Sequence, residues 1–257
     1  MNKKDIEYYR KNGFIIINAF SKKDIDNFKT DISKRVNQLS SNYFGKNFNI
    51  INYHILEYKK NLHHKIVSQN KRHIKITKEI KKKINNNNTI NKILNSYWNH
   101  NNYKLLMMGN RKKGKEDPFL VDRVSYRLAR PVNFSKNDVG GFHYDLRYGG
   151  SNNTNQNAFA SLWVPICGFS NKYSLKICPG SHLVNHKKSN ISKQNKFTST
   201  VFKESYIKKF KSFRPNLKKG QAIFFHPNLL HGGSINLGKF SRVSLEFRLC
   251  NKKEFEI

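Results

Sequence analysis

Short apolar runs alternate with glycine-rich turns through the second half of the chain, and this pattern limits the fold more than any other feature. Runs rich in β-branched and aromatic side chains recur at 121–129, 158–166, 174–178, 197–202, 221–225 and 242–249. Gly-Gly, Pro-Gly or Lys-Gly pairs separate most of these runs. Repeated short strands joined by such turns are typical of a β-sandwich or a jelly roll. We therefore expect a β core from about residue 119 onward.

The N-terminal part favours helices around one strand. Residues 3–11 are polar and tolerate a helix, which Asn12-Gly13 would end, and the apolar run 14–17 predicts a strand. Ser21 and Asp24 then form an acidic variant of the capping box. The helix that follows would bury one face, because its apolar residues recur at steps of three and four: Ile25, Phe28, Ile32, Val36 and Leu39.

Residues 45–115 are rich in lysine, asparagine and histidine and only weakly periodic, with helical pieces predicted around 74–84 and 89–98. Hydrophobic residues make up 37% of the 257 residues, which suffices for one sizeable core. We expect one domain over 1–257, with a helical, variable part at about 1–118 and the β core at about 119–257. The predicted fold class is mainly β with flanking helices, a jelly roll.

The chain is strongly basic, since 49 Lys and Arg residues oppose 16 Asp and Glu residues for a formal net charge of +33. Such a charge would favour binding to the phosphates of a nucleic acid. The basic residues form scattered clusters, however, at 81–83, 111–113 and 187–188 rather than one stripe. A solvated basic surface, which would also attract an anionic small molecule, fits this spread better than a nucleic-acid groove.

The expected location is the cytoplasm. No run approaches the roughly 18 apolar residues of a membrane helix. The first residues carry acidic side chains and no apolar segment, so no secretory signal is expected. The three cysteines, Cys167, Cys178 and Cys250, form no CxxC pair. This sparse use argues against a disulfide framework or a cysteine-bound zinc and favours a reducing compartment.

The residues best suited to chemistry are His143, Asp145 and His231. Side chains at positions i and i+2 of an extended backbone point to the same side, so His143 and Asp145 can reach one centre. His231 follows another β run, and a jelly roll brings distant strands face to face. Two imidazoles and a carboxylate on one face of a metal are the ligand set of non-haem Fe(II) oxygenases. The alternatives are a surface turn pair for His143 and Asp145, and His226 in place of His231.

Arg242 strengthens the metal interpretation. It lies eleven residues after His231, and Ser244 follows it on the same strand face. A buried guanidinium needs a partner and can bind a carboxylate through two parallel hydrogen bonds. A co-substrate that chelates iron at one end and carries a carboxylate at the other, as 2-oxoglutarate does, would supply both contacts. Arg248 shares this strand face and would either pair with an acid or contact a substrate.

With these residues the sequence resembles the phytanoyl-CoA dioxygenase (PhyH-like) family of Fe(II)/2-oxoglutarate-dependent oxygenases. The resemblance rests on residues 8–15, the Gly-Phe-His-Tyr-Asp segment 141–145, the Pro-Gly-Ser-His turn 179–182, the Leu-His-Gly-Gly segment 230–233 and the Arg-Val-Ser segment 242–244. It implies a double-stranded β-helix in which His143, Asp145 and His231 hold Fe(II). It also implies that Arg242, helped by Ser244, binds the distal carboxylate of 2-oxoglutarate.

The resemblance implies a non-haem iron dioxygenase that uses 2-oxoglutarate and O2, hydroxylates a C–H bond of a small molecule and releases succinate and CO2. Asp145 disfavours halogenation, because halogenating relatives lack this carboxylate. Arg127, Arg147 and Trp163 are candidate substrate contacts, and an arginine in the mouth of the site would favour an anionic substrate. Two alternatives stay open: a 2-oxoglutarate oxygenase that acts on nucleic acid, and a non-catalytic jelly-roll binding module.

Overall fold

A seven-stranded antiparallel sheet forms the centre of the fold. The computed structural model describes residues 2–59, 61–66, 73–98, 103–106, 125–135, 138–139, 141–145, 159–170, 172–186, 191–193, 201–232 and 235–251. The strand order is β1–β9–β5–β11–β4–β2, and β3 also pairs with β11. The strands are β1 (Phe14–Asn18), β2 (His73–Lys75), β3 (Tyr103–Leu106), β4 (Ser125–Ala129), β5 (Phe159–Cys167), β9 (Gln221–Phe225) and β11 (Arg242–Asn251).

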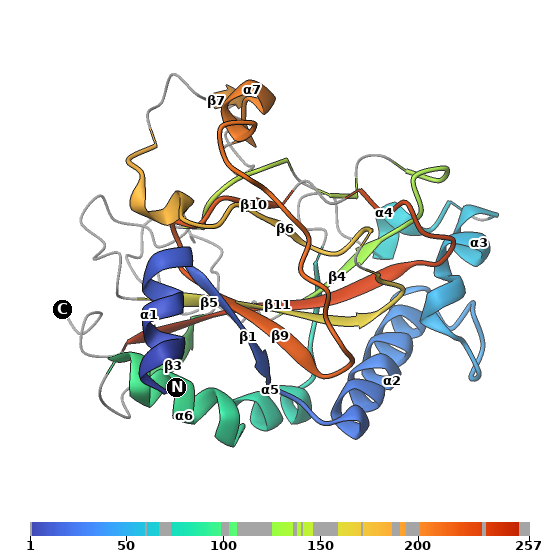
Figure 1. Cartoon of the computed structure of the whole chain (residues 1–257). Coiled ribbons are helices and arrows are strands. Elements are labelled where there is room, and N and C mark those ends of the chain that lie inside the picture. The colour runs from blue at the N-terminus through green and yellow to red at the C-terminus, as the bar shows by residue number, and fades with distance from the viewer. Residues whose placement is uncertain are drawn as a thin grey trace, which may run out of the picture.

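A second, smaller sheet faces this one. It consists of β6 (Lys176–Ile177) and β10 (His231–Gly232), which pair antiparallel and lie above the long strands in Figure 1. A further pair, β7 (Ile191–Lys193) with β8 (Val201–Phe202), lies near the top of the same view. The two facing antiparallel sheets and the surrounding helices confirm the predicted mainly-β, jelly-roll fold class.

The helices belong mostly to the first part of the chain. They are α1 (Lys3–Asn12), α2 (Lys22–Leu39), the 3₁₀ turn η1 (Ile50–Asn52), α3 (Tyr53–Tyr58), α4 (His63–Ile66), α5 (Lys78–Asn85), α6 (Asn88–Trp98), the 3₁₀ turn η3 (Ser181–Leu183) and α7 (Glu204–Ile207). In Figure 1, α5 and α6 run below the sheet and α2 lies at its lower right. Among the helices that the structure describes, none is long and apolar enough to cross a membrane.

The predicted caps of the first two helices are confirmed. Ser21 accepts a hydrogen bond from the Asp24 backbone N–H at 3.1 Å, and the Asp24 carboxylate accepts one from the Ser21 N–H at 2.9 Å. Gly13 ends α1 in the left-handed conformation, with φ of 78°. A side chain there would also meet the His182 ring at 2.5 Å. Glycine is therefore required at this turn by both conformation and space.

One hydrophobic core joins the helical part to the main sheet. Phe28, Ile32 and Val36 form the buried face of α2, as their spacing predicts, but Leu39, expected on the same face, is 44% exposed at the end of the helix. They belong to the same cluster of buried side chains as Leu162 and Val164 of β5. Each large apolar side chain that is fully buried contributes about 1.5–3 kcal/mol. The helices therefore stabilise the sheet that carries the candidate site.

The helix predicted around 74–84 is wrong at its start. Residues 73–75 form β2, in which Ile74 pairs with Tyr126 of β4, and α5 begins only at Lys78. Thr77 caps this helix by accepting a hydrogen bond from the Ile80 N–H. Pairing with a distant strand therefore prevails over local helix preference in this segment.

A buried ionic network ties the helical part to the end of β4. The Arg130 guanidinium donates two hydrogen bonds to the Asp138 carboxylate, both at 2.9 Å, and one to Glu57 of α3 at 2.6 Å. The side chains of Glu57 and Asp138 are 2% and 5% exposed, so solvent screens these pairs little. His63 contributes a backbone N–H to Glu57 at 3.0 Å. The network therefore fixes α3 and α4 against the β core.

Replacing Arg130 with methionine should destabilise the protein by about 3 kcal/mol, because it leaves two buried carboxylates without their cation. The measurement is the free energy of unfolding from denaturant titration. Lys219→Met is the matched control, since it breaks an ion pair with Asp26 in which both side chains are well exposed. It should cost less than about 1 kcal/mol. Equal losses in the two variants would contradict the assigned importance of the network.

Candidate metal centre

The backbone brings two distant histidines face to face. His143 and His231 form an isolated antiparallel bridge, in which each backbone N–H donates to the carbonyl oxygen of the other at 2.9 Å. His231 begins β10, so the bridge extends the smaller sheet. The Asp145 N–H donates to the Pro227 carbonyl at 2.7 Å. Main-chain hydrogen bonds therefore fix all three residues predicted as metal ligands.

Their side chains converge on one point. One ligand atom from each of His143, Asp145 and His231 lies within 4.8 Å of the other two. The Oδ1 atom of Asp145 is 4.0 Å from Nε2 of His143 and 3.8 Å from Nε2 of His231. All three residues are buried. Three such donors around one point have the composition and spacing that a single divalent ion needs.

In both imidazoles the hydrogen bond is made at Nδ1, which leaves Nε2 available to a metal. Nδ1 of His143 lies 2.9 Å from the Gly141 carbonyl, and Nδ1 of His231 lies 2.9 Å from the Leu229 carbonyl. A carbonyl can only accept, so each Nδ1 carries the proton and each Nε2 presents its lone pair. Burial, together with the neighbouring His231, lowers the pKa of His143 to about 3. The His143 ring is therefore neutral near pH 7, as a metal ligand must be.

The carboxylate of Asp145 is held at both oxygens. Ser161 of β5 donates to Oδ2 at 2.7 Å, and the Arg248 guanidinium of β11 contacts Oδ1. Burial by itself would raise the pKa of Asp145, but the neighbouring Arg248 guanidinium lowers it overall. The carboxylate therefore stays ionised in a buried position. Of the two possibilities that the sequence left for Arg248, pairing with an acid is the one observed.

Two small pockets of about 20 Å³ each lie along β11 beside this cluster. One is lined by Asp145 and His231, and the other by Arg242 and Ser244. They share four lining residues, which are Arg127, Trp163, Leu175 and Glu246, and we refer to the two pockets together as the cavity. Residues 242, 244, 246 and 248 of β11 each line at least one of them, as expected for one face of a strand. The shared lining places the predicted carboxylate anchor close to the candidate metal position.

Arg242 lines the pocket that lies away from the histidines. It is only 7% exposed and donates a hydrogen bond to the Tyr173 carbonyl. Burial lowers its pKa to about 10, so it remains a cation near neutral pH. In the lining that the two pockets share, Nε of Arg127 lies 3.0 Å from the Glu246 carboxylate. The charge of Arg127 is therefore balanced within the cavity wall.

Of the other predicted site residues, Trp163 and Arg127 lie in the cavity wall. Trp163 is buried in the cavity wall, and Arg127 lines it as a partner of Glu246. Arg147 lies outside the described residues. His226 packs on His182 with ring centroids 5.1 Å apart and does not join the three-residue cluster among the residues that are described. The geometry therefore favours His231 over its rival.

Sequence reasoning missed the role of Ser161 and the ion pair of Glu246. Ser161 interrupts an apolar run, and only the fold shows that it faces a carboxylate. Glu246 carried a usable signal, because it sits at even spacing between Arg242 and Arg248 on the same strand. A charged residue on the inward face of a strand needs a partner, and that partner is Arg127.

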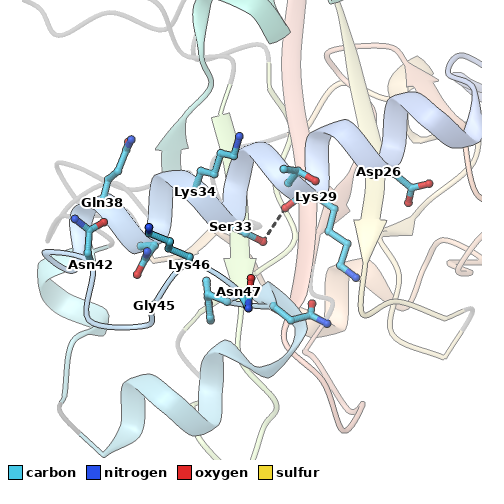
Figure 2. Close-up of a pocket in the computed structure, with 13 residues that line it drawn as sticks. Asp26, Lys29, Ser33, Lys34, Gln38, Asn42, Gly45, Lys46 and Asn47 are labelled. Carbon is cyan, nitrogen blue, oxygen red and sulfur yellow. Dashed lines mark hydrogen bonds between the residues drawn. The ribbon is translucent and has the colours of Figure 1, made fainter.

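A larger groove lies elsewhere and lacks metal ligands. It has a volume of about 610 Å³ and lies between α2 and residues 42–49 (Figure 2). Figure 2 shows Lys29, Lys34 and Lys46 around it. Its lining contains no histidine or cysteine, and its single carboxylate, Asp26, pairs with Lys219 at 2.6 Å. Size alone therefore does not identify the reactive site.

Comparison with known proteins gives one family and a set of similar folds. The family model described as Phytanoyl-CoA dioxygenase (PhyH) matches residues 9–244. No curated protein gives a significant match to the sequence.

Three solved structures share the fold. The non-heme alpha ketoglutarate dependent carbocyclase SnoK from nogalamycin biosynthesis has 12% identity, covers 98% of this chain and 84% of its own, and has a TM-score of 0.60. The non-heme monooxygenase ThoJ has 15% identity over 95% and 76% of the two chains, with a TM-score of 0.55. AviO1 from Streptomyces viridochromogenes Tue57 has 11% identity over 96% and 94%, with a TM-score of 0.53. At these identities the likeness concerns the fold alone.

Proposed function

The chain belongs to the phytanoyl-CoA dioxygenase family, and on that basis we propose that it is an Fe(II)/2-oxoglutarate-dependent dioxygenase that hydroxylates a C–H bond of a small molecule. Succinate and CO2 are the expected co-products. The observation that carries this proposal is the buried cluster of His143, Asp145 and His231, whose ligand atoms lie within 4.8 Å of one another.

In the proposed arrangement, His143, Asp145 and His231 hold the iron and leave its other side open. The two imidazoles bind through Nε2, because each Nδ1 proton is donated to a backbone carbonyl. Iron, 2-oxoglutarate and O2 would together supply the oxidising chemistry that the protein's own side chains lack. The protein contributes fixed geometry, a desolvated site and two imidazoles whose Nε2 atoms are left for the metal.

Arg242 and Ser244 are proposed to bind the distal carboxylate of 2-oxoglutarate. Both line the pocket that shares four lining residues with the pocket at Asp145 and His231. A guanidinium binds a carboxylate through two parallel hydrogen bonds, and burial strengthens this attraction. The anchored co-substrate would then reach toward the metal position along the wall formed by Trp163 and Leu175.

The substrate contacts are proposed to come from Trp163, Arg127 and Arg147. Trp163 offers a large apolar surface inside the cavity. The Arg127 guanidinium is paired with Glu246 at 3.0 Å, so an anionic substrate would gain from Arg127 only by competing with that carboxylate. The predicted preference for an anionic substrate therefore depends mainly on Arg147 and on the overall positive charge.

The test is turnover of 2-oxoglutarate in the absence of any other substrate. Purified protein with Fe(II), ascorbate and 2-oxoglutarate under air should release succinate, and the same mixture without oxygen should release none. A metabolite screen for compounds that accelerate succinate release would then identify the substrate class. If folded, iron-loaded protein forms no succinate with or without candidate substrates, the proposed activity is wrong.

A further inference from the structure

Two neighbouring strands place one side chain on each oxygen of Asp145. Arg248 of β11 and Ser161 of β5 are direct partners in the antiparallel register. Ser161 donates to Oδ2 at 2.7 Å, and the Arg248 guanidinium contacts Oδ1. Because both side chains lie at one level of the sheet, the carboxylate is held across two strands rather than by its own loop alone.

The same register level continues onto a third strand. Phe225 of β9 pairs with Ser161, and its ring packs on the imidazole of His231 with centroids 4.7 Å apart. We refer to Phe225, Ser161 and Arg248 as the support row. Each member contacts a side chain of the candidate metal centre, so the main sheet supports the Asp145 carboxylate and the His231 imidazole.

Arg248 is the member of the support row that acts on the metal-facing oxygen. Oδ1 is the carboxylate atom that lies 3.8 Å and 4.0 Å from the two imidazole Nε2 atoms. A carboxylate oxygen has two lone-pair positions, so Oδ1 can accept from Arg248 on one side and face a cation on the other. Ser161 meanwhile holds Oδ2, which prevents the carboxylate from rotating away.

We propose that Arg248 is a positioning residue, which orients Asp145 so that Oδ1 alone faces the metal. This inference rests on the proposed function, since it assumes that the cluster binds a divalent ion. The Arg248 charge opposes a nearby cation, but the loss of a partner that orients a ligand weakens metal binding about 10- to 100-fold in other sites. The orienting effect is expected to be the larger of the two.

The test measures metal binding directly, without oxygen, 2-oxoglutarate or turnover. Co²⁺ is titrated into metal-free protein, and affinity is followed by calorimetry while the ligand-field absorption of Co²⁺ reports its coordination. Arg248→Met should raise the Co²⁺ dissociation constant about 10- to 100-fold and change the absorption bands, because Oδ1 loses the partner that fixes its direction toward the metal. The Co²⁺ dissociation constant of Arg248→Lys should lie between those of the unchanged protein and Arg248→Met, since an ammonium keeps the charge but lacks the planar pair of donors.

Lys239→Met is the matched control, because Lys239 is exposed and its replacement removes one positive charge without touching the support row. Its Co²⁺ affinity and absorption should equal those of the unchanged protein. Unchanged or tighter Co²⁺ binding with unchanged bands in Arg248→Met would overturn the positioning role. If Arg248→Met does not fold, Arg248→Lys decides, and wild-type affinity and bands in that variant would likewise overturn it. Failure of the unchanged protein to bind Co²⁺ would instead contradict the proposed function itself.

Discussion

Replacing His143 with alanine is expected to abolish succinate formation while the protein stays folded. The variant loses one of three metal donors, and its neutral side chain makes no ion pair that the fold depends on near pH 7. Asp145→Ala should have the same effect on turnover, because it removes the only carboxylate of the cluster. The measurement is succinate released per folded molecule, with circular dichroism and thermal unfolding as checks on the structure.

His226→Ala is the matched histidine control for this experiment. His226 is buried five residues before His231 but makes its contacts with His182 and the Asn228 backbone N–H. It should retain succinate formation when activity is expressed per folded molecule. Full succinate output from either His143→Ala or Asp145→Ala would refute the assignment of the iron ligands.

Replacing Arg242 with alanine is expected to raise the 2-oxoglutarate concentration needed for half-maximal turnover by orders of magnitude. Removing one partner of a desolvated, hydrogen-bonded charge pair costs on the order of 2–5 kcal/mol. That loss corresponds to roughly a 30- to 5,000-fold change in affinity. Arg242 is 7% exposed, so solvent would replace little of the missing interaction. The measurement is the dependence of succinate release on 2-oxoglutarate concentration.

Two further variants sharpen the Arg242 experiment. Arg242→Lys should raise the required 2-oxoglutarate concentration less than Arg242→Ala does, because lysine keeps the positive charge. It should still raise it, because an ammonium cannot form two parallel hydrogen bonds to the carboxylate. Arg10→Ala removes an exposed arginine of α1 and should leave the requirement for 2-oxoglutarate unchanged. An unchanged requirement in Arg242→Ala would remove Arg242 from its proposed role and place the carboxylate elsewhere.

The parts of the fold and site that follow short-range rules could be predicted from sequence. Ser21 and Asp24 predicted the start of α2 because a capping box needs only residues three apart. The same holds for His143 and Asp145, whose i and i+2 spacing placed them on one side of an extended segment. The even spacing of Arg242 and Arg248 likewise predicted a shared strand face.

The parts that depend on distant partners could not be predicted. Nothing local indicates that Ser161 would face Asp145 or that Glu57 would meet Arg130 across the fold. The strand at 73–75 pairs with β4, a partner that lies about fifty residues away and leaves no mark in the segment itself. The single-domain organisation and the role of Arg147 stay predictions.

The reciprocal hydrogen bonds between the backbones of His143 and His231 have a consequence for metal loading. The main chain fixes the separation of these two residues, so they are brought together when the chain folds and not when an ion binds. The metal site should therefore be preformed in the metal-free protein. Removing the metal with a chelator should leave the protein folded, unlike domains that fold only with their metal. Added metal should then raise the melting temperature in proportion to the logarithm of its concentration above the dissociation constant.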